Sequence, residues 1–101
     1  MSINLKAITS CIGYEQITSL ATATALNAPS TDANGLSCRP SFALITSEGA
    51  AVRWRDDGGA PTASLGMPLA AGVTLQYDGD IARIRFIQQT AGAKLNISYY
   101  A

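Results

Sequence analysis

The sequence contains no histidine, and it offers few of the arrangements on which enzymes depend. None of its 101 residues carries an imidazole, the group that performs much of the acid–base chemistry near pH 7. No serine, threonine or cysteine lies within a recognisable nucleophile motif. We therefore expect a protein that is not an enzyme, with no catalytic residues and no bound cofactor.

The sequence also lacks net charge. Seven basic residues balance seven acidic ones, so no long-range field favours nucleic acid or an anionic membrane surface. No apolar run approaches the roughly 18 residues of a membrane span, and the start of the chain lacks the pattern of a signal peptide. We expect neither nucleic acid nor a membrane as a partner, and synthesis in the cytoplasm.

Cysteine is scarce, and Cys11 and Cys38 lie far apart in the sequence. In a chain without an export signal we interpret them as free, buried thiols, with a disulfide as the alternative. Two cysteines without histidine do not complete a metal site. The segments Asp56 to Gly59 and Asp78 to Asp80 lack the ligand spacing and terminal glutamate of a calcium loop. We therefore expect no bound metal.

What the chain does contain is an alternation of apolar and polar residues with a period of two. The alternation is clearest in Val52 to Gly58, Val73 to Gly79 and Leu95 to Tyr99, and it is typical of strands with one buried face. Turns are predicted at Ser10 to Glu15 and Met67 to Gly72, among others. The predicted strands are Ile3 to Ile8, Ile17 to Leu26, Cys38 to Ser47, Ala51 to Arg55, Ala60 to Gly66, Val73 to Tyr77, Ile81 to Gln89 and Lys94 to Tyr100.

Strands at this spacing favour an all-β fold with a single domain over residues 1–101. The expected architecture is an antiparallel β-sandwich, a jelly roll of about eight strands. A long loop over Asn27 to Ser37, rich in turn-forming residues, interrupts it. The residues predicted to point into the core are Val52, Trp54, Val73, Leu75, Tyr77, Ile84, Phe86, Leu95, Ile97 and Tyr99, joined by Phe42 and Leu44.

Arginines are predicted to stand on the outer strand faces, where they flank Trp54 and Ile84. They are Arg53, Arg55, Arg83 and Arg85. One interpretation is cross-strand pairing with nearby aspartates, which serves solubility and register: Asp56, Asp57, Asp78 or Asp80. The other is a docking surface, because arginine is enriched at protein interfaces and its planar fork binds carboxylates. Both interpretations can hold together.

Further contact candidates lie in the long loop and at the end of the chain. Asp32 and Asn34 belong to the predicted loop, and exposed loops of this length often contact a partner. Tyr100 is predicted to point away from the core, where its ring offers a large contact area at low entropic cost. With the arginines, these residues make up the predicted interface.

Several segments of the second half resemble small structural proteins encoded among the head and tail genes of tailed bacteriophages. The resemblance covers residues 48–101 and depends on these segments taken together: Val52 to Gly58, Ala60 to Ala63, Gly66 to Leu69, Tyr77 to Gly79 and Leu95 to Tyr100. It implies a virion component, most often a β-sandwich that assembles on a larger shell or tube. It implies no catalytic residues.

Within that class, the leading interpretation is a capsid decoration, or cement, protein. Such a protein would bind and stabilise the shell of the major capsid protein as a homo-oligomer, for example a trimer, because multivalent attachment multiplies weak contacts. One alternative is a head-completion, collar or tail structural protein. The other is a receptor- or carbohydrate-binding module displayed on the particle, which would need Trp54 or exposed tyrosines. The expected location is the virion, assembled in the host cytoplasm.

Overall fold

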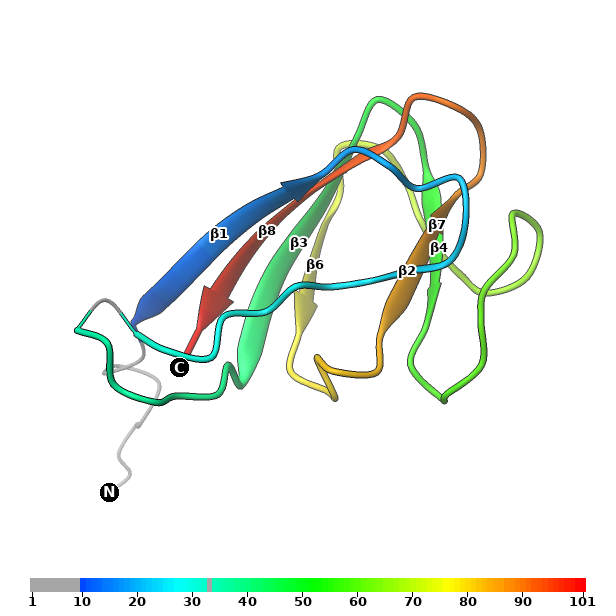
Figure 1. Ribbon diagram of the computed structural model, residues 1–101. Helices are drawn as coiled ribbons and strands as arrows, with labels where there is room; N and C mark the ends of the chain where they lie inside the picture. The colour runs from blue at the N-terminus through cyan, green and yellow to red at the C-terminus, as the bar shows by residue number, and fades with distance from the viewer. Residues whose placement is uncertain (1–9, 33) are drawn as a thin grey trace, which may run out of the picture.

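The computed structural model describes residues 10–32 and 34–101, and the regular structure in this part of the chain is entirely β (Figure 1). The prediction of an all-β fold is therefore confirmed. Eight strands form two antiparallel sheets, and they are β1 (Cys11–Ile17), β2 (Thr24–Ala25), β3 (Phe42–Glu48), β4 (Val52–Arg55), β5 (Met67–Leu69), β6 (Thr74–Tyr77), β7 (Arg85–Gln88) and β8 (Lys94–Tyr100).

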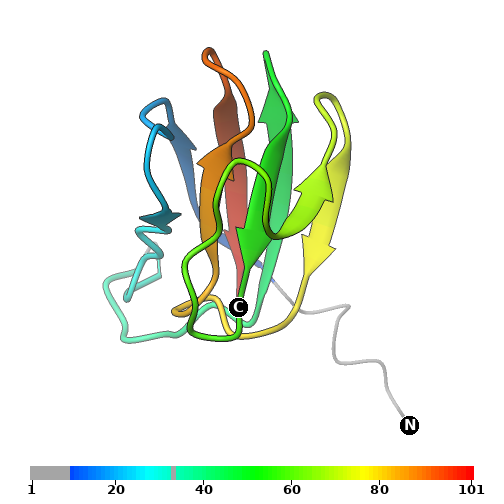
Figure 2. The same cartoon turned by 90° about the vertical axis from the view of Figure 1, so that its right-hand side faces the viewer.

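The two sheets contain four strands each and face one another. The first sheet has the order β1-β8-β3-β6, and the second has the order β2-β7-β4-β5. Figure 2 shows the second sheet in front of the first. Strands from the two ends of the chain pair in a nested way: β1 with β8, β2 with β7, β3 with β6 and β4 with β5. This arrangement is compatible with a β-sandwich.

One hydrophobic core lies between the sheets, and alternating residues of both sheets contribute to it. Ile45 and Leu95 of the first sheet and Val52 and Phe86 of the second are fully buried. The core prediction is confirmed for Val52, Tyr77, Ile84, Phe86, Leu95, Ile97 and Tyr99, and Trp54 and Leu75 pack against the cluster while partly exposed.

Three residues predicted to lie in the core are placed elsewhere. Val73 is 49% exposed, because it precedes β6 at an open edge of the first sheet. Phe42 and Leu44 take the outer positions of β3, while Ala43 and Ile45 are buried. The segment has apolar residues in both phases of the alternation. Choosing the larger apolar side chains as the buried ones therefore assigned the wrong face of β3 to the core.

The predicted secondary structure near the start of the chain is also wrong. β1 occupies most of the segment from Ser10 to Glu15 that we expected to turn. The predicted strand from Ile17 to Leu26 is irregular apart from its first residue and β2. Gly13 does mark an irregularity, because the pairing with β8 shifts register between Cys11 and Gly13. The predicted strand from Ile3 to Ile8 lies outside the described residues.

Two further boundaries differ from the sequence prediction. β5 forms within the segment from Met67 to Gly72 that we expected to be a connection, because an edge strand tolerates Pro68. The segment from Ala60 to Gly66 contains only an isolated bridge instead of a strand. β7 begins at Arg85 instead of Ile81, because the preceding residues form a turn closed by hydrogen bonds to the Asp80 carbonyl.

Candidate functional site: an arginine surface on the second sheet

The arginines of the predicted interface come together at the outer face of the second sheet. β4 buries Val52, so alternation turns Arg53 and Arg55 outward. β7 buries Phe86 in the same way and turns Arg85 outward, directly opposite Arg55 in the strand register. We call these residues, with Arg83 of the preceding turn, the arginine surface: Arg53, Arg55, Arg83 and Arg85.

Arg55 is held by Asp57 through two hydrogen bonds. Its Nη2 donates to Oδ2 of Asp57 at 2.7 Å, and its Nε donates to Oδ1 at 3.1 Å. The N–H of Gly59 donates to the same carboxylate at 3.1 Å. These hydrogen bonds lower the pKa of Asp57 to about 2, and those from Arg55 have a larger effect than the one from Gly59. This is the only ion pair among the described residues, and it joins neighbours in the chain instead of crossing between strands.

Arg53 binds backbone carbonyls and forms no ion pair with a carboxylate among the described residues. Its Nη1 donates to the carbonyl of Gly66 at 2.8 Å, and its Nε donates to that of Ala63 at 3.3 Å. Gly66 has a φ of 138°, a backbone conformation that favours glycine. These two hydrogen bonds from Arg53 therefore hold the 60–66 loop against the second sheet.

The side chains of Arg83 and Arg85 form no hydrogen bond or ion pair with the residues that the structure describes. The guanidinium of Arg83 lies over Gly58, where an added Cβ would come within 2.5 Å of Nη2. Gly58 also has a φ of 92°, a backbone conformation that favours glycine. Arg85 lies opposite Arg55 across the strands, where the ion pair of Arg55 with Asp57 offsets the repulsion between the two cations.

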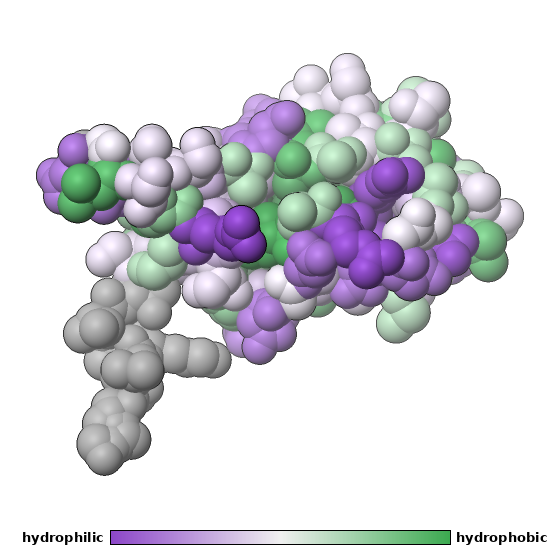
Figure 3. Space-filling model, turned by 60° about the horizontal axis from the view of Figure 1, so that its bottom comes forward, coloured by the Kyte–Doolittle hydropathy of each residue, from purple (hydrophilic) through white to green (hydrophobic). Residues whose placement is uncertain are grey.

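The outer surface near these arginines also contains apolar side chains. A shallow hollow of about 290 Å³ is lined by Arg55 and Asp57 together with Leu65 and Met67, which are each 56% exposed. Figure 3 shows strongly hydrophilic residues interspersed with apolar ones on the side of the molecule where β4 and β7 lie. A partner segment with carboxylates beside an apolar side chain would match this combination.

The other predicted interface residues lie at the opposite end of the molecule, away from the arginine surface (Figure 1). Asp32 closes its own loop, because its Oδ1 accepts the N–H groups of Asn34 at 2.9 Å and Leu36 at 3.0 Å. Tyr100 packs its ring against Phe42, with the ring centroids 5.8 Å apart. The structure therefore divides the predicted interface into two separate regions.

Three of the four aspartates in the segments Asp56 to Gly59 and Asp78 to Asp80 form hydrogen bonds with protein groups. Asp56 accepts a hydrogen bond from the hydroxyl of Tyr77 at 2.6 Å, and Asp57 holds Arg55. Asp80 caps the turn that follows it. In residues 10–32 and 34–101, no three metal-ligating side chains are grouped so that they could hold an ion.

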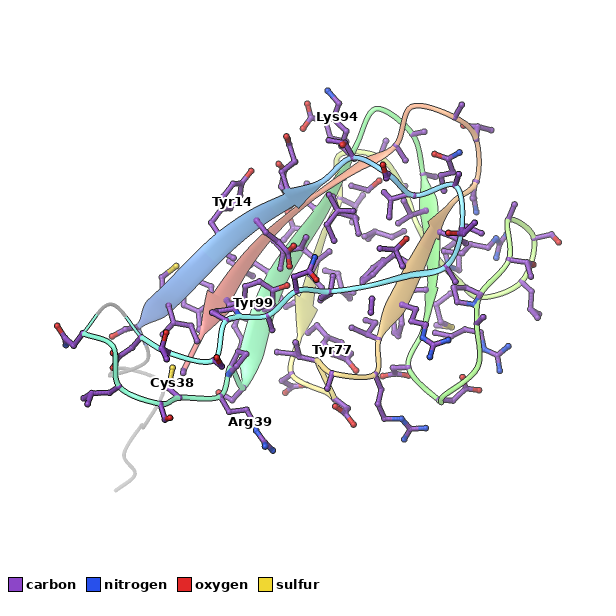
Figure 4. All side chains as sticks on the ribbon, viewed as in Figure 1. Tyr14, Cys38, Arg39, Tyr77, Lys94 and Tyr99 are labelled. Carbon is purple, nitrogen blue, oxygen red and sulfur yellow. The ribbon has the colours of Figure 1, made fainter. Side chains whose placement is uncertain are left out.

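The two cysteines are free, as expected, but they are not buried. Cys11 is exposed, and Cys38 is partly exposed. Cys38 and Arg39 belong to the lining of an open groove of about 830 Å³ between the loop before β3 and the turn after β6. Figure 4 shows both residues at this end of the molecule.

A polar network on the outer face of the first sheet was not found by the sequence analysis. Tyr14 is 63% exposed, and its hydroxyl donates to Oδ1 of Asn96 at 2.6 Å. Gln16 donates to the same atom at 2.9 Å, and the amide of Asn96 donates to Glu48 at 2.9 Å. Tyr14 projects away from the second sheet (Figure 4). The signal was the alternation within β1, which we assigned to a turn.

No helix in the described part of the chain is long and apolar enough to cross a membrane. No protein-family model, curated protein or solved structure matches the chain. Its function is therefore argued from the geometry and chemistry of its own surfaces.

Proposed function

We propose that this protein is a non-enzymatic structural component of a bacteriophage virion, a capsid decoration protein that binds and stabilises the shell of the major capsid protein. The observation that carries the proposal is the arginine surface, in which Arg83 and Arg85 have no anionic partner among the described residues. The chain has no net charge, but these arginines lie together on one face of a sheet. Such a face is suited to docking on a protein surface that carries carboxylates.

The finer architecture that we propose is a jelly-roll β-sandwich. The nested pairing of the strands supports it, because a long hairpin folded across itself into two sheets takes this order. Double-sheet jelly rolls occur in viral capsid proteins and in lectins. The fold therefore agrees with a virion role by analogy only, and the arginine surface supplies the specific argument.

The test is a charge reversal at the two unpaired arginines. We expect the variant Arg83→Glu/Arg85→Glu to fold normally, because both side chains lie on the surface and form no hydrogen bond with the described residues. Its affinity for shells assembled from the major capsid protein of the same virus should fall by at least about 2 kcal/mol, roughly thirtyfold in Kd. Co-sedimentation of the purified protein with the shells measures this.

Arg39→Glu is the control outside the arginine surface, and it reverses one charge where the test variant reverses two. Arg39 is also exposed and forms no ion pair with the described residues, but it lies outside the second sheet, in the segment before β3 (Figure 4). We expect Arg39→Glu to bind shells as the unmodified chain does. Equal binding by Arg83→Glu/Arg85→Glu would refute the docking role, and equal losses in both variants would reduce it to a non-specific charge effect.

Attachment at the head-completion site, collar or tail would use the same arginine surface on a different partner. A decoration protein occurs at many symmetric positions of the shell, whereas a collar or tail component occurs in a ring of few copies. The number of copies per particle, measured by quantitative mass spectrometry of purified virions, separates the two. We expect a number proportional to that of the major capsid protein.

A second candidate function is glycan binding by the outer face of the first sheet. The exposed ring of Tyr14 beside the amides of Gln16 and Asn96 favours it, because sugars bind aromatic faces flanked by uncharged polar groups. Trp54 packs against Tyr77 with ring centroids 5.9 Å apart, so it is less suited to this role. A glycan array compared between the unmodified chain and Tyr14→Ala tests the candidate, and binding lost with Tyr14 would support it.

A further inference from the structure

The two sheets have four edge strands, and three of them carry features that hinder pairing with another chain. β1 has the register shift near Gly13 and turns the charged side chain of Glu15 toward the interior. β2 is two residues long, and β5 contains Pro68, which has no N–H to donate. Bulges, inward charges, short strands and prolines are the usual protections of a sheet edge.

The fourth edge strand, β6, has none of these features. Its residues Thr74 to Tyr77 include no proline and no charged side chain, and they pair with β3 in continuous register. β6 ends the first sheet, so its other side has no strand partner among the described residues. Thr74 and Gln76 are exposed. This edge is a template for one more extended strand.

Apolar side chains are exposed on the same side of the molecule. Val73, directly before β6, is 49% exposed, and Met67 on β5 is 56% exposed. β5 and β6 lie together at one side of the two sheets (Figure 2). The alternation of the chain places Val73 in phase with Leu75 and Tyr77, both of which face inward. A strand added beyond β6 would cover Val73.

We propose that β6 is a self-association edge, at which two copies of this chain pair β6 with β6 in antiparallel fashion about a two-fold axis. With Leu75 on the axis, Thr74 of each copy lies opposite Gln76 of the second copy, and Val73 lies opposite Tyr77. Polar residues then meet on the outer face and apolar residues meet on the inner face. The first sheets of the two copies become one continuous sheet.

A second copy fits this edge for reasons of charge and of geometry. An edge without charged side chains produces no repulsion when it meets itself. The protected edge of β1 disfavours a head-to-tail contact between β6 and β1, which would build rings or filaments. An isologous contact remains, and it closes at two copies, whereas a trimer was our example of the homo-oligomer expected of a decoration protein. This inference does not depend on the virion role.

The test places like charges on the pairing edge of the purified full-length chain. In the variant Thr74→Lys/Gln76→Lys, each new lysine faces a lysine of the second copy, so dimerisation should weaken by roughly tenfold or more. The control is Tyr14→Lys/Gln16→Lys, which puts lysines at outward positions of β1, the opposite edge of the same sheet. Sedimentation equilibrium over a micromolar-to-millimolar concentration series measures the mass, and circular dichroism checks folding.

We expect the unmodified chain and the β1 variant to show the mass of two chains at high concentration, and the β6 variant to remain a monomer. Amide hydrogen exchange of the unmodified chain supplies a readout without mutation, because Thr74 to Tyr77 should exchange more slowly as concentration rises. A monomer at all concentrations, a trimer, or a dimer that survives the β6 lysines would overturn the inference. So would exchange at β6 that is independent of concentration.

Discussion

Tyr77 and Tyr99 bring two phenol groups into the interior of the molecule, and each donates a hydrogen bond to a carboxylate. The hydroxyl of Tyr77 donates to Asp56 at 2.6 Å, and that of Tyr99 donates to Glu15. The two side chains are 6% and 1% exposed. Figure 4 shows both extending from the first sheet toward the second. These bonds connect the strands β6 and β8 to carboxylates on other segments, so they are part of what closes the core.

Burial, the bond to the carboxylate and the negative charge of that carboxylate all raise the pKa of both tyrosines above the ordinary value of about 10. Above about pH 10 the unfolded chain therefore releases phenol protons that the folded chain still holds. The stability that the tyrosines contribute is complete below that pH and is lost as the pH rises. Each tyrosine should lower the free energy of unfolding by up to about 1.4 kcal/mol per pH unit, and the pair by up to about 2.8 kcal/mol.

Urea unfolding at a series of alkaline pH values measures this slope. Tyr77→Phe and Tyr99→Phe should each remove about half of the alkaline loss of stability that these two tyrosines cause, and the double variant should remove all of that loss. Each substitution also leaves a carboxylate with one donor fewer, at a cost of about 1–3 kcal/mol at neutral pH. Ultraviolet absorbance reports phenolate formation directly. The reasoning is refuted if the double variant keeps the alkaline slope of the unmodified chain.

Two further predictions concern the core and the arginine surface. Phe86→Ala should lower the free energy of unfolding by about 3–5 kcal/mol, because Phe86 is fully buried between the sheets, and a smaller loss in urea unfolding would mean that the site is not close-packed. Asp57→Asn should flatten the decline of the melting temperature in acid. The pKa of Asp57 is lowered to about 2 in the folded chain, so its stabilising contribution is present above the unfolded pKa near 4 and is lost as the pH falls toward 2. An unchanged acid limb in calorimetry would contradict that assignment.

The alternation of apolar and polar residues predicted the elements with one clear phase. β8 (Lys94–Tyr100) has the predicted bounds, because Leu95, Ile97 and Tyr99 are its only inward candidates. β4 was predicted to within one residue for the same reason. β3 was predicted as a strand, but its face was assigned wrongly, because Phe42 and Leu44 compete with the buried positions Ala43 and Ile45. Packing between the strands decides which of the two faces is buried, and the periodicity of the sequence carries no information about that packing.

The arginine surface could be predicted only in part. Alternation around Trp54 placed Arg53 and Arg55 on the outer face correctly. The different roles of the arginines could not be predicted, because they depend on which loops fold back over the sheet. The double glycine of the 56–59 loop gives room for the guanidinium groups of Arg55 and Arg83, as only the folded structure reveals. The edge strand β5 was missed because the segment from Met67 to Gly72 was assigned to a connection as a whole.

Cryo-electron microscopy of virions with and without this protein is the most direct test of the proposed function. The account predicts additional density at symmetric positions of the shell in particles that carry the protein. The outer face of the second sheet, with Arg83 and Arg85, should lie against carboxylates of the major capsid protein. Particles without such density, or density in which the arginine surface faces solvent, would contradict the account.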